Sequence, residues 1–475
     1  MGQLTGVSWP VAGGGYGEPM TEVDRFLDRL AAEAQRRGHA LYLVGGSVRD
    51  QIMGRLGHDL DLATDAPVST AKQMLEAAGP DSIYTIGEKF GTVGAVVGDT
   101  TVELTTFRSQ DRKAAHDVLA ALYTDLAHRD FTINAMARDL GTGELHDPYG
   151  GQSDIERRLI RAVGNPEERF REDPVRLLRA VRLAAQLGFA IEPQTTQAIR
   201  RLAHLLEGVA RERVGDELDR LLLAPKPSEG IHLLDRLGLL PYTIPEILEM
   251  HEMERGPHHY KEVYPHTMKV LDRTEPDLIL RWAALLHDIA KPRTYSVSDG
   301  QVHFIGHDKL GAKMAREILT RLRRPRELVE PVVKLVEEHL RIGMYDPSWT
   351  DGAVRRFLRE TAPVTERLFA LSRADITSQR AHRVAAALAR VDALYQRCKE
   401  LLAREEIEKI RSPLDGHELM RIFGGKPGPW IGQVKDYLLN LVLDGELAQD
   451  DKETAERLAR QYLKEHPELG IQVPD

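Results

Sequence analysis

The hydrophobic pattern changes once along the chain, and this change limits the folds that are open to it. Before the turn sequence DPYGG at residues 147–151, segments with the alternation of strands are mixed with segments of helical spacing. After this turn the apolar residues recur almost entirely at helical spacing, interrupted by proline, glycine and aspartate. A chain of 475 residues is also too long for one hydrophobic core. The sequence therefore predicts an α+β fold in which a head with a mixed sheet precedes a long helical body.

The expected strands of the head are four short segments. They cover residues 40–44, 59–62, 93–97 and 101–105. Gly98-Asp99 between the last two segments indicates a tight turn. A helix is expected over residues 21–40, where apolar residues recur at helical spacing. This order is typical of a sheet covered by helices.

The composition limits the partners and the location of the protein. No apolar run approaches the roughly 20 residues that cross a membrane, and residues 1–20 lack the basic flank and apolar stretch of a signal peptide. A single cysteine, Cys398, excludes an internal disulfide framework and fits the reducing cytosol. The net charge of −9 argues against a uniformly basic nucleic-acid binder, although eight arginines lie between residues 155 and 182. We therefore expect a cytoplasmic protein without membrane association.

The segment LYLVGGSVRDQIMGRLGHDLDLATDA, residues 41–66, combines a glycine pair, a cation and two carboxylates. Gly45 and Gly46 follow a buried strand and precede a helix, so their N–H groups and the helix end could face a phosphate. Arg49, one turn into that helix, could add a bidentate phosphate contact. Asp59 and Asp61 point to the same side of a strand, because successive side chains alternate between its faces.

A third carboxylate follows in VELTT, where Glu103 faces away from its apolar neighbours Val102 and Leu104. An isolated D-x-D pair usually marks only a solvated strand face. Three carboxylates beside a phosphate-binding turn can instead hold two Mg²⁺ ions about 3.5–4 Å apart. Such a pair of ions activates a hydroxyl and holds a triphosphate, so the pattern predicts nucleotidyl transfer.

The order of these motifs resembles the class II tRNA nucleotidyltransferase and bacterial poly(A) polymerase family. The motifs are GGSVRD with DLD, HRDFTINAMA at 128–137, DPYGGQSDIERRLIR at 147–161 and REDPVRLLRAVR at 171–182. They span residues 38–225 in the family order, with His128 where the family usually has arginine. The resemblance implies a polymerase-β-type head that uses Mg²⁺, with tRNA, CTP and ATP as partners and pyrophosphate as a product.

The resemblance also assigns roles to the matched residues. The metal ligands are Asp59, Asp61 and Glu103, and the triphosphate is bound by Gly45, Gly46 and Arg49. Arg129 and Asp130 contact the ribose, and Asn134 supports their loop. For Arg129 and Asp130, a local ion pair is the alternative interpretation.

The motif EDPVRLLR suggests how a base is selected. Asp173, Arg176 and Arg179 recur every three residues, so we expect them on one face of a helix, with Pro174 in its first turn. An aspartate accepts from the exocyclic amino group of cytosine or adenine, and an arginine donates to the adjacent ring acceptor. Guanine and uracil have the opposite polarity and would leave charges unpaired. The alternative is a ladder of surface ion pairs.

Six residues farther along resemble the ligands of the HD phosphohydrolase fold. They are His266 in YPHTMKVLD, His287 and Asp288 in LLHDIAKP, His307 in FIGHD, His339 in EEHL and Asp375 in SRADI. Imidazole and carboxylate ligands suit a divalent transition metal. Ala290 stands where glycine is common in this motif. The resemblance implies a metal-binding domain of a class that includes phosphatases and cyclic phosphodiesterases.

These assignments divide the chain into five parts. They are a flexible tail over residues 1–20, the nucleotidyltransferase head over 21–155, a helical neck over 156–240, the HD domain over 241–385 and a helical arm over 386–475. In the arm, Lys426 and Trp430 are candidate RNA contacts, with a structural loop around a buried tryptophan as the alternative.

Three functions fit these motifs. The leading one is a template-independent tRNA 3′-end nucleotidyltransferase, and the others are a poly(A) polymerase and an HD nucleotide phosphohydrolase with an RNA-binding head. The HD residues and the lack of a long basic extension favour the tRNA enzyme. Only 19 residues separate TTFR (105–108) from HRDF (128–131), without the basic element that enzymes adding all of CCA usually carry there. CC-only addition therefore stays open beside CCA addition.

Overall fold

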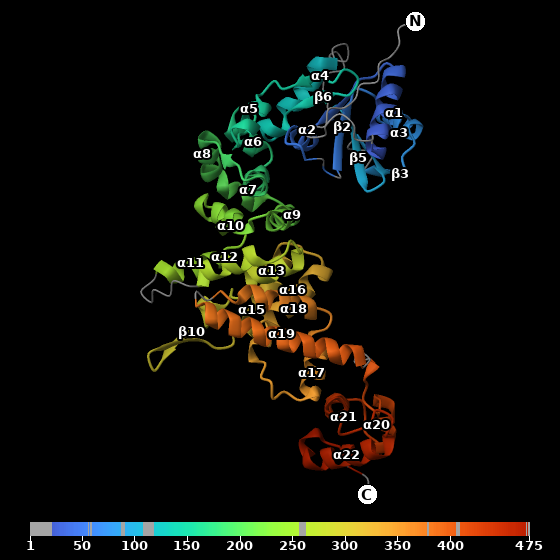
Figure 1. The fold of residues 1–475 in the computed structure, drawn as a ribbon, viewed down its shortest axis with the longest axis vertical. Helices are drawn as coiled ribbons and strands as arrows, with labels where there is room; N and C mark the ends of the chain where they lie inside the picture. Colours follow the sequence, from blue (N-terminus) through green and yellow to red (C-terminus); the bar gives the residue numbers. More distant parts are fainter. Residues whose placement is uncertain are drawn as a thin grey trace. The chain divides into compact units, whose positions relative to one another are not determined.

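The computed structural model describes residues 21–55, 57, 59–86, 91–107, 118–255, 263–377, 380–404, 409–471 and 473. The predicted tail therefore lies outside the described residues. The chain forms two compact units, Met1–Thr243 and Ile244–Asp475, which are described one at a time. The first contains a mixed sheet followed by helices, and the second is mainly helical, so the predicted α+β class is confirmed (Figure 1).

In the described part of the first unit, a sheet of seven strands has the order β3-β4-β5-β2-β1-β6-β7. The strands are β1 (Leu41–Val44), β2 (Asp59–Thr64), β3 (Ser82–Ile86), β4 (Thr92–Val97), β5 (Thr100–Thr106), β6 (Ala137–Asp139) and β7 (Leu145–His146). Only β2 and β5 pair in parallel among these neighbours. The four predicted strands are confirmed, and β3, β6 and β7 complete the sheet.

One face of the sheet is apolar and is covered by α1 (Glu22–Arg36) and α3 (Val68–Ala78) (Figure 1). Leu60 and Leu62 of β2 are buried, whereas Asp59 and Asp61 are exposed on the opposite face. That opposite face is partly covered by α4 (Val118–Ala127), which shares a small core with β1 and β6. The alternation along β2 therefore separates the core from a polar face, as its sequence predicted.

The remainder of the first unit is mostly helical. Its elements are α2 (Gly46–Ile52), the short turn η3 (Thr132–Asn134), α5 (Gly151–Glu156), α6 (Pro166–Glu172), α7 (Arg176–Leu187), α8 (Pro193–Leu202), α9 (Arg211–Leu222) and α10 (Pro227–Arg236). Helix α7 packs against α9 and α10 and buries Leu177, Leu178 and Val181. The strands β8 (Leu159–Ile160) and β9 (Ala190–Ile191) pair in parallel, which the helical pattern did not predict.

The second unit is a helical assembly with one hairpin in its described part. Its elements are α11 (Glu246–Arg255), α12 (Val263–Arg273), α13 (Leu278–Leu286), α14 (Lys291–Thr294), β10 (Tyr295–Ser298), β11 (Gln301–Phe304), α15 (His307–Arg321), α16 (Arg326–Glu338), α17 (Asp351–Thr361), α18 (Thr365–Asp375), α19 (Ala381–Arg404), α20 (Gly416–Phe423), α21 (Pro429–Asp444) and α22 (Lys452–Glu465). Trp282, Phe357 and Phe369 are among its largest fully buried side chains. None of the helices in the described ranges has the length and apolar character needed to span a bilayer.

The last three helices have their own hydrophobic cluster, which settles the role of Trp430. This side chain is only 4% exposed and packs with Phe423, and its Nε1 donates to the carbonyl of Lys426 at 2.9 Å. A ring in this position stabilises the fold and cannot stack on RNA. The structural interpretation of the loop is therefore the correct one for Trp430.

Candidate functional site

The three carboxylates of the head project from adjacent parallel strands. In the register of β2 and β5, Asp61 lies directly beside Glu103 and Asp59 lies beside Thr101. Directly paired residues point to the same face of a sheet. The structure therefore brings Asp59, Asp61 and Glu103 to one polar surface, as expected from the two separate motifs.

The electrostatics of this surface favour a bound cation. The surrounding protein partly desolvates the Asp61 carboxyl, although the residue as a whole is exposed, and this raises its pKa; Asp59 raises it further, while Arg129 and Arg49 act in the opposite direction. Burial raises the pKa of Glu103 as well, and the two aspartates add to this effect. Carboxylates that repel one another in this way are suitable ligands for a hard divalent cation. The donor set, oxygen atoms only, fits Mg²⁺.

Gly45 contributes space at the edge of this surface. Its φ is +67°, and a Cβ atom at this position would lie 2.5 Å from Nη1 of Arg129 and 3.6 Å from Oδ2 of Asp61. Its N–H donates to the carbonyl of Met136 at 3.2 Å. The expectation that this N–H is free for a phosphate is therefore wrong for Gly45. What the glycine provides is close approach beside an arginine and a carboxylate.

Ser47 was not recognised as a site residue from the sequence. Its hydroxyl accepts from the backbone N–H of Asp61 at 2.9 Å and donates to the carbonyl of Asp59 at 3.4 Å. This buried side chain thereby holds the carboxylate strand against the start of α2. The sequence signal that could have indicated this role is the position of Ser47 directly after the glycine pair.

Arg49 is held in place by two neighbours. Its Nε and Nη2 each donate to Asp50 at 2.8 Å, and its Nη1 donates to Asn134 at 2.8 Å. Asn134 in turn donates to Asp130 at 3.1 Å. Asn134 therefore joins the arginine of the first motif to the aspartate of the second.

Arg129 and Asp130 do not form an ion pair with each other. Arg129 donates to Asp125 at 3.2 Å, and Asp130 accepts from Arg179 at 3.1 Å. Burial would raise the pKa of Asp130, but Arg179 and Asn134 lower it below its usual value. Asp130 is therefore a charged group fixed between the head motif and α7.

Asp173 does not lie on the helix that carries Arg176 and Arg179, so this part of the prediction was wrong. Helix α6 ends before Asp173, which is extended with φ −147° and ψ 95°, and α7 begins at Arg176. The physical reason is Pro174, since the residue before a proline is sterically excluded from the helical region. The motif forms a corner between two helices.

All three residues of this motif have protein partners. Asp173 accepts a bidentate pair of hydrogen bonds from Arg213 at 3.0 and 2.8 Å. Arg179 bridges Asp130 and Glu217, and Arg176 donates to the carbonyls of Arg169 and His128. The Nε atom of Arg176 is buried and has no hydrogen-bond partner in the described part of the chain. A buried donor of this kind is costly unless another group comes to accept from it.

The six expected metal ligands of the second unit come together. They form two trios, His266 with His287 and Asp375, and Asp288 with His307 and His339, and the ligand atoms within each trio lie within 4.8 Å of one another. Asp288 lies between the trios, because its Oδ2 is 3.3 Å from Nε2 of His287 and its Oδ1 is 3.6 Å from Nε2 of His307. A carboxylate with one oxygen toward each group is suited to bridge two metal ions.

Hydrogen bonds from Nδ1 orient the four imidazole rings of this cluster. In His287, His307 and His339, Nδ1 lies 2.8, 2.6 and 2.6 Å from the carbonyl oxygens of Ala284, Phe304 and Val336, and in His266 it lies 2.8 Å from the hydroxyl of Thr377. A ring that donates from Nδ1 presents the lone pair of Nε2 to the centre, which is the usual arrangement of histidine metal ligands. The mixed nitrogen and oxygen donors fit a divalent transition metal.

The charges around this cluster are strongly coupled. Burial alone would lower the pKa of His287, but Asp288 and Asp375 raise it to about 10. Burial lowers the pKa of His339 to about 4, with a further contribution from His287. Lys291, which sequence reasoning passed over, donates to Asp288 at 2.7 Å. The two carboxylates therefore attract positive charge, which metal ions would supply.

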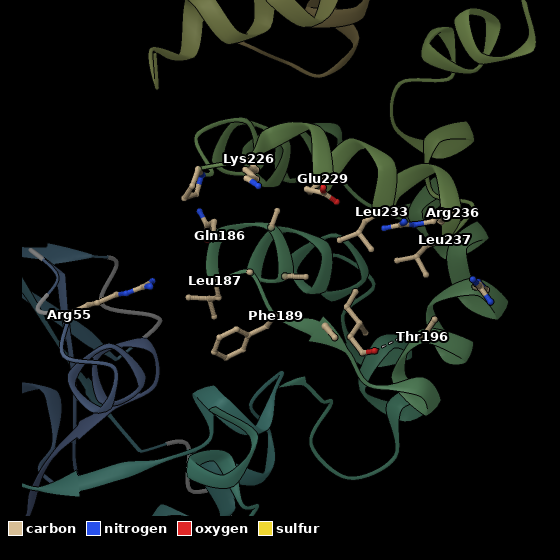
Figure 2. Close-up of a pocket in the computed structure, with 17 residues that line it drawn as sticks. Arg55, Gln186, Leu187, Phe189, Thr196, Lys226, Glu229, Leu233, Arg236 and Leu237 are labelled. Carbon is tan, nitrogen blue, oxygen red and sulfur yellow. Dashed lines mark hydrogen bonds between the residues drawn. The ribbon is translucent and has the colours of Figure 1, made fainter. Parts of the chain in front are cut away.

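A separate pocket of about 910 Å³ in the first unit contains none of the predicted site residues. It lies at the C-terminal end of α7, where Leu187 and Phe189 meet Leu233 of α10 (Figure 2). Lys226 and Arg236 are at its rim, and Figure 2 shows Arg55 extending from the head toward it. The pocket is apolar inside and mainly basic at its edge.

Three family models match successive parts of the chain. The model of the poly A polymerase head domain matches residues 41–161, and the model of the HD domain matches residues 246–380. Between them, residues 188–250 match the model described as "Probable RNA and SrmB- binding site of polymerase A". The matches follow the same order as the motifs.

The chain is also similar to tRNA nucleotidyltransferases over nearly its whole length. It is 34% identical to the A-adding tRNA nucleotidyltransferase of Deinococcus radiodurans, with 90% of this chain and 96% of that relative covered. It is 32% identical to the CC-adding tRNA nucleotidyltransferase of Thermus thermophilus, with 87% and 92% covered. The crystal structure of the Bacillus stearothermophilus CCA-adding enzyme in complex with CTP is 26% identical and has a TM-score of 0.65, with 95% of this chain and 100% of that chain covered. The chain therefore belongs to the family of class II tRNA nucleotidyltransferases, which add CCA, CC or A to the 3′ end of tRNA.

Proposed function

We propose that this chain extends the 3′ end of tRNA with nucleotides taken from CTP and ATP and releases pyrophosphate. The observation that carries this proposal is the set of three carboxylates on one sheet face, Asp59, Asp61 and Glu103, beside Gly45 and Arg129. The relatives named above act on tRNA, and the similar crystal structure contains CTP. The relatives named above match this chain over 87–90% of its length, which favours this function over a poly(A) polymerase or an HD phosphohydrolase with an inactive head.

In this proposal the three carboxylates would hold two Mg²⁺ ions, which would supply a lower pKa for the attacking hydroxyl and neutralise the triphosphate. Gly45, which has no side chain, lets Arg129 lie close to the backbone beside Asp61. Arg129, and Arg49 after it exchanges its present partners, bind the phosphate oxygens. Asp130, kept charged by Arg179, accepts a hydrogen bond from a ribose hydroxyl.

We propose that Asp173, Arg176 and Arg179 select the base. The pair of Asp173 with Arg213 is partly exposed, so an incoming base can replace Arg213 at little cost. Asp173 would accept from the exocyclic amino group of cytosine or adenine. The buried Nε of Arg176 is a donor that has no partner among the residues that the structure describes. Guanine and uracil have the opposite polarity, which would leave both groups unpaired.

For the second unit we propose a metal-dependent phosphohydrolase centre. The six ligands of the two trios would hold two divalent transition-metal ions, with Asp288 between them. Two ions at such a site bind a phosphate ester and activate a water molecule. A phosphate monoester and a 2′,3′-cyclic phosphate are the two substrate classes to be compared.

The chain could add CCA, CC or only the terminal A to tRNA, and the length of the product distinguishes these three activities. Sequence reasoning considered CCA and CC-only addition, and the similarity to an A-adding relative brings in the third. The CC-only expectation rests on residues 109–127, of which 109–117 lie outside the described residues and the rest form α4. It therefore stays a prediction.

The test uses labelled tRNAs that end at the discriminator base or after the two C residues, incubated with CTP, ATP or both. Products are sized at single-nucleotide resolution. If the tRNA that ends at the discriminator base grows by CCA, the chain is a CCA-adding enzyme, and if it grows by CC, the chain is a CC-adding enzyme. If only the tRNA that already ends in two C residues is extended, by one adenosine, the chain is an A-adding enzyme. A long adenosine ladder would identify a poly(A) polymerase, and no product on either tRNA would contradict the proposal. Glu103→Gln serves as the inactive control.

A further inference from the structure

Tyr84 stands in line with the carboxylates of the head. The strand registers pair Tyr84 with Gly94, Gly94 with Glu103, and Glu103 with Asp61. Because directly paired residues point to the same face, these positions form one row across four strands. The tyrosine therefore faces the same side of the sheet as the proposed metal ligands.

A glycine in this row allows the tyrosine ring to lie over the sheet. A Cβ atom on Gly94 would be 2.3 Å from Cζ and 2.4 Å from Cε2 of Tyr84, so the ring covers the glycine backbone. On β5, the strand beyond β4, Thr101 is paired with Asp59 of β2. Tyr84 is 37% exposed. The ring thus lies over β4, on the side of β3 that leads to the carboxylates, and keeps part of its surface open.

The strand order indicates on which side of the reacting phosphorus the ring of Tyr84 would lie. Gly45 follows β1 and Arg129 precedes β6, whereas Tyr84 is on β3, at the other side of β2 and β5 in the order β3-β4-β5-β2-β1-β6. In an in-line displacement the attacking oxygen and the leaving phosphate lie on opposite sides of the reacting phosphorus. If the triphosphate lies beside Gly45 and Arg129, the acceptor must approach from the side of Tyr84.

We propose that Tyr84 is a stacking platform for the 3′-terminal nucleotide of the acceptor tRNA. This inference rests on the proposed function of the head. Stacking on an aromatic ring tolerates any base, which suits an acceptor whose last base differs between tRNAs and between steps of addition. A neutral ring also binds RNA without competing for the charge of the neighbouring carboxylates. The alternative is that the ring only covers Gly94 and stabilises the sheet.

The test uses tRNA whose last nucleotide is the fluorescent base 2-aminopurine, because stacking on an aromatic ring quenches its emission. Binding to the wild-type chain, without nucleotide, should quench the emission, and Tyr84→Phe should retain the quenching because it keeps the ring. Tyr84→Leu should bind without quenching, and its KM for tRNA should rise about tenfold while the KM for CTP is unchanged. Thr101→Val is the matched control, which changes a neighbouring side chain on β5 and keeps the ring.

Three results would overturn the proposal. The first is equal quenching by Tyr84→Leu and the wild type, and the second is loss of quenching in Tyr84→Phe. The third concerns an acceptor whose last nucleotide is abasic: its KM should be the same for Tyr84→Leu and the wild type, and a remaining difference would overturn the proposal. Melting temperatures of all variants identify a purely structural effect, which would lower stability and leave the quenching intact. A wild-type chain that quenches but adds no nucleotide would refute the proposed function instead.

Discussion

The two candidate metal sites of this protein differ in how far their ligands are fixed before a metal arrives. In the second unit, six ligands are gathered in two trios, and each histidine is oriented by a hydrogen bond from Nδ1. In the head, three carboxylates stand side by side on strands β2 and β5. Among the described residues, their oxygen atoms do not form a group whose members all lie within 4.8 Å of one another, as the ligand atoms of each trio do. The first arrangement gathers its protein ligands in one place, and the second presents an open row of carboxylates.

The difference indicates two ways of acquiring a metal. Mg²⁺ in nucleotide enzymes is usually held by one or two carboxylates together with the substrate phosphates. An open row of carboxylates beside Gly45 and Arg129 fits that arrangement, because the triphosphate would complete the shell. The buried cluster of the second unit, with six protein ligands, would hold metal ions without help from a substrate.

The largest effect is expected from the head carboxylates. Replacing Asp59 or Asp61 with alanine should reduce nucleotide addition by more than about a thousandfold, since each removes a metal ligand. The fold should persist because Leu60 and Leu62 keep their packing. Single-turnover addition to tRNA measures the loss, and Glu76→Ala, an exposed carboxylate on α3, is the control that should retain activity. More than a few per cent of wild-type activity in either aspartate variant would refute the metal assignment.

A similarly large but separate effect is expected in the second unit. His287→Ala should remove bound transition metal and any phosphatase or cyclic phosphodiesterase activity, because it takes a ligand from one trio. Nucleotide addition by this variant should stay within about twofold of the wild type, since the two centres share no residue. Elemental analysis and both activity assays provide the readouts. Joint loss of the two activities would mean that the centres are coupled.

A smaller effect is expected on base selection. Asp173→Ala should lower the discrimination of CTP and ATP against UTP and GTP by about tenfold to a hundredfold, because the cost of an unpaired carboxylate disappears. Ratios of kcat/KM for the four nucleotides measure this change. Glu168→Ala on α6 removes an exposed carboxylate nearby and should leave the ratios unchanged. Unchanged preference in Asp173→Ala with lower stability would make the corner between α6 and α7 a structural element.

The smallest effect is expected from the anchoring of the buried cluster. Asp277 caps α13 through the N–H of Leu280 at 2.9 Å and also accepts from Arg367 of α18 at 2.9 Å. It therefore ties together the helices that lead to His287 and Asp375. Asp277→Ala should lower the free energy of unfolding of the second unit by about 1–2 kcal/mol at pH 7.

This stabilisation should depend on pH. Burial raises the pKa of Asp277, but the hydrogen bonds from Arg367 and Leu280 lower it below its usual value overall. A lowered pKa means that the stabilisation is present above the unfolded-state pKa of about 3.9 and is lost as the pH falls below it. Urea unfolding of Asp277→Ala and the wild type should therefore differ at pH 7 and converge toward pH 3. A constant difference over this range would show that the charge of Asp277 does not contribute.

The sequence was sufficient where the local pattern determines the structure. Alternation along β2 predicted which side chains are buried, and the separate motifs predicted the carboxylate row and the six ligands that the structure brings together. It failed at Asp173, where the local steric effect of Pro174 was overlooked. It also failed where tertiary contacts decide, because the N–H of Gly45 is used by Met136, a partner on another segment. The alignment of Tyr84 with Glu103 depends on strand pairings that no local pattern reveals.

Titration with Mn²⁺, followed by the paramagnetic signal of the free ion, tests the central comparison most directly. The wild-type chain, Asp59→Ala and His287→Ala are each titrated with and without CTP. After subtraction of the Mn²⁺ that CTP binds by itself, the account predicts that some ions bind tightly without CTP and are lost only in His287→Ala. It also predicts that further ions bind only with CTP and are lost only in Asp59→Ala. Tight binding without CTP that Asp59→Ala abolishes, or CTP-dependent binding that Asp59→Ala retains, would contradict it.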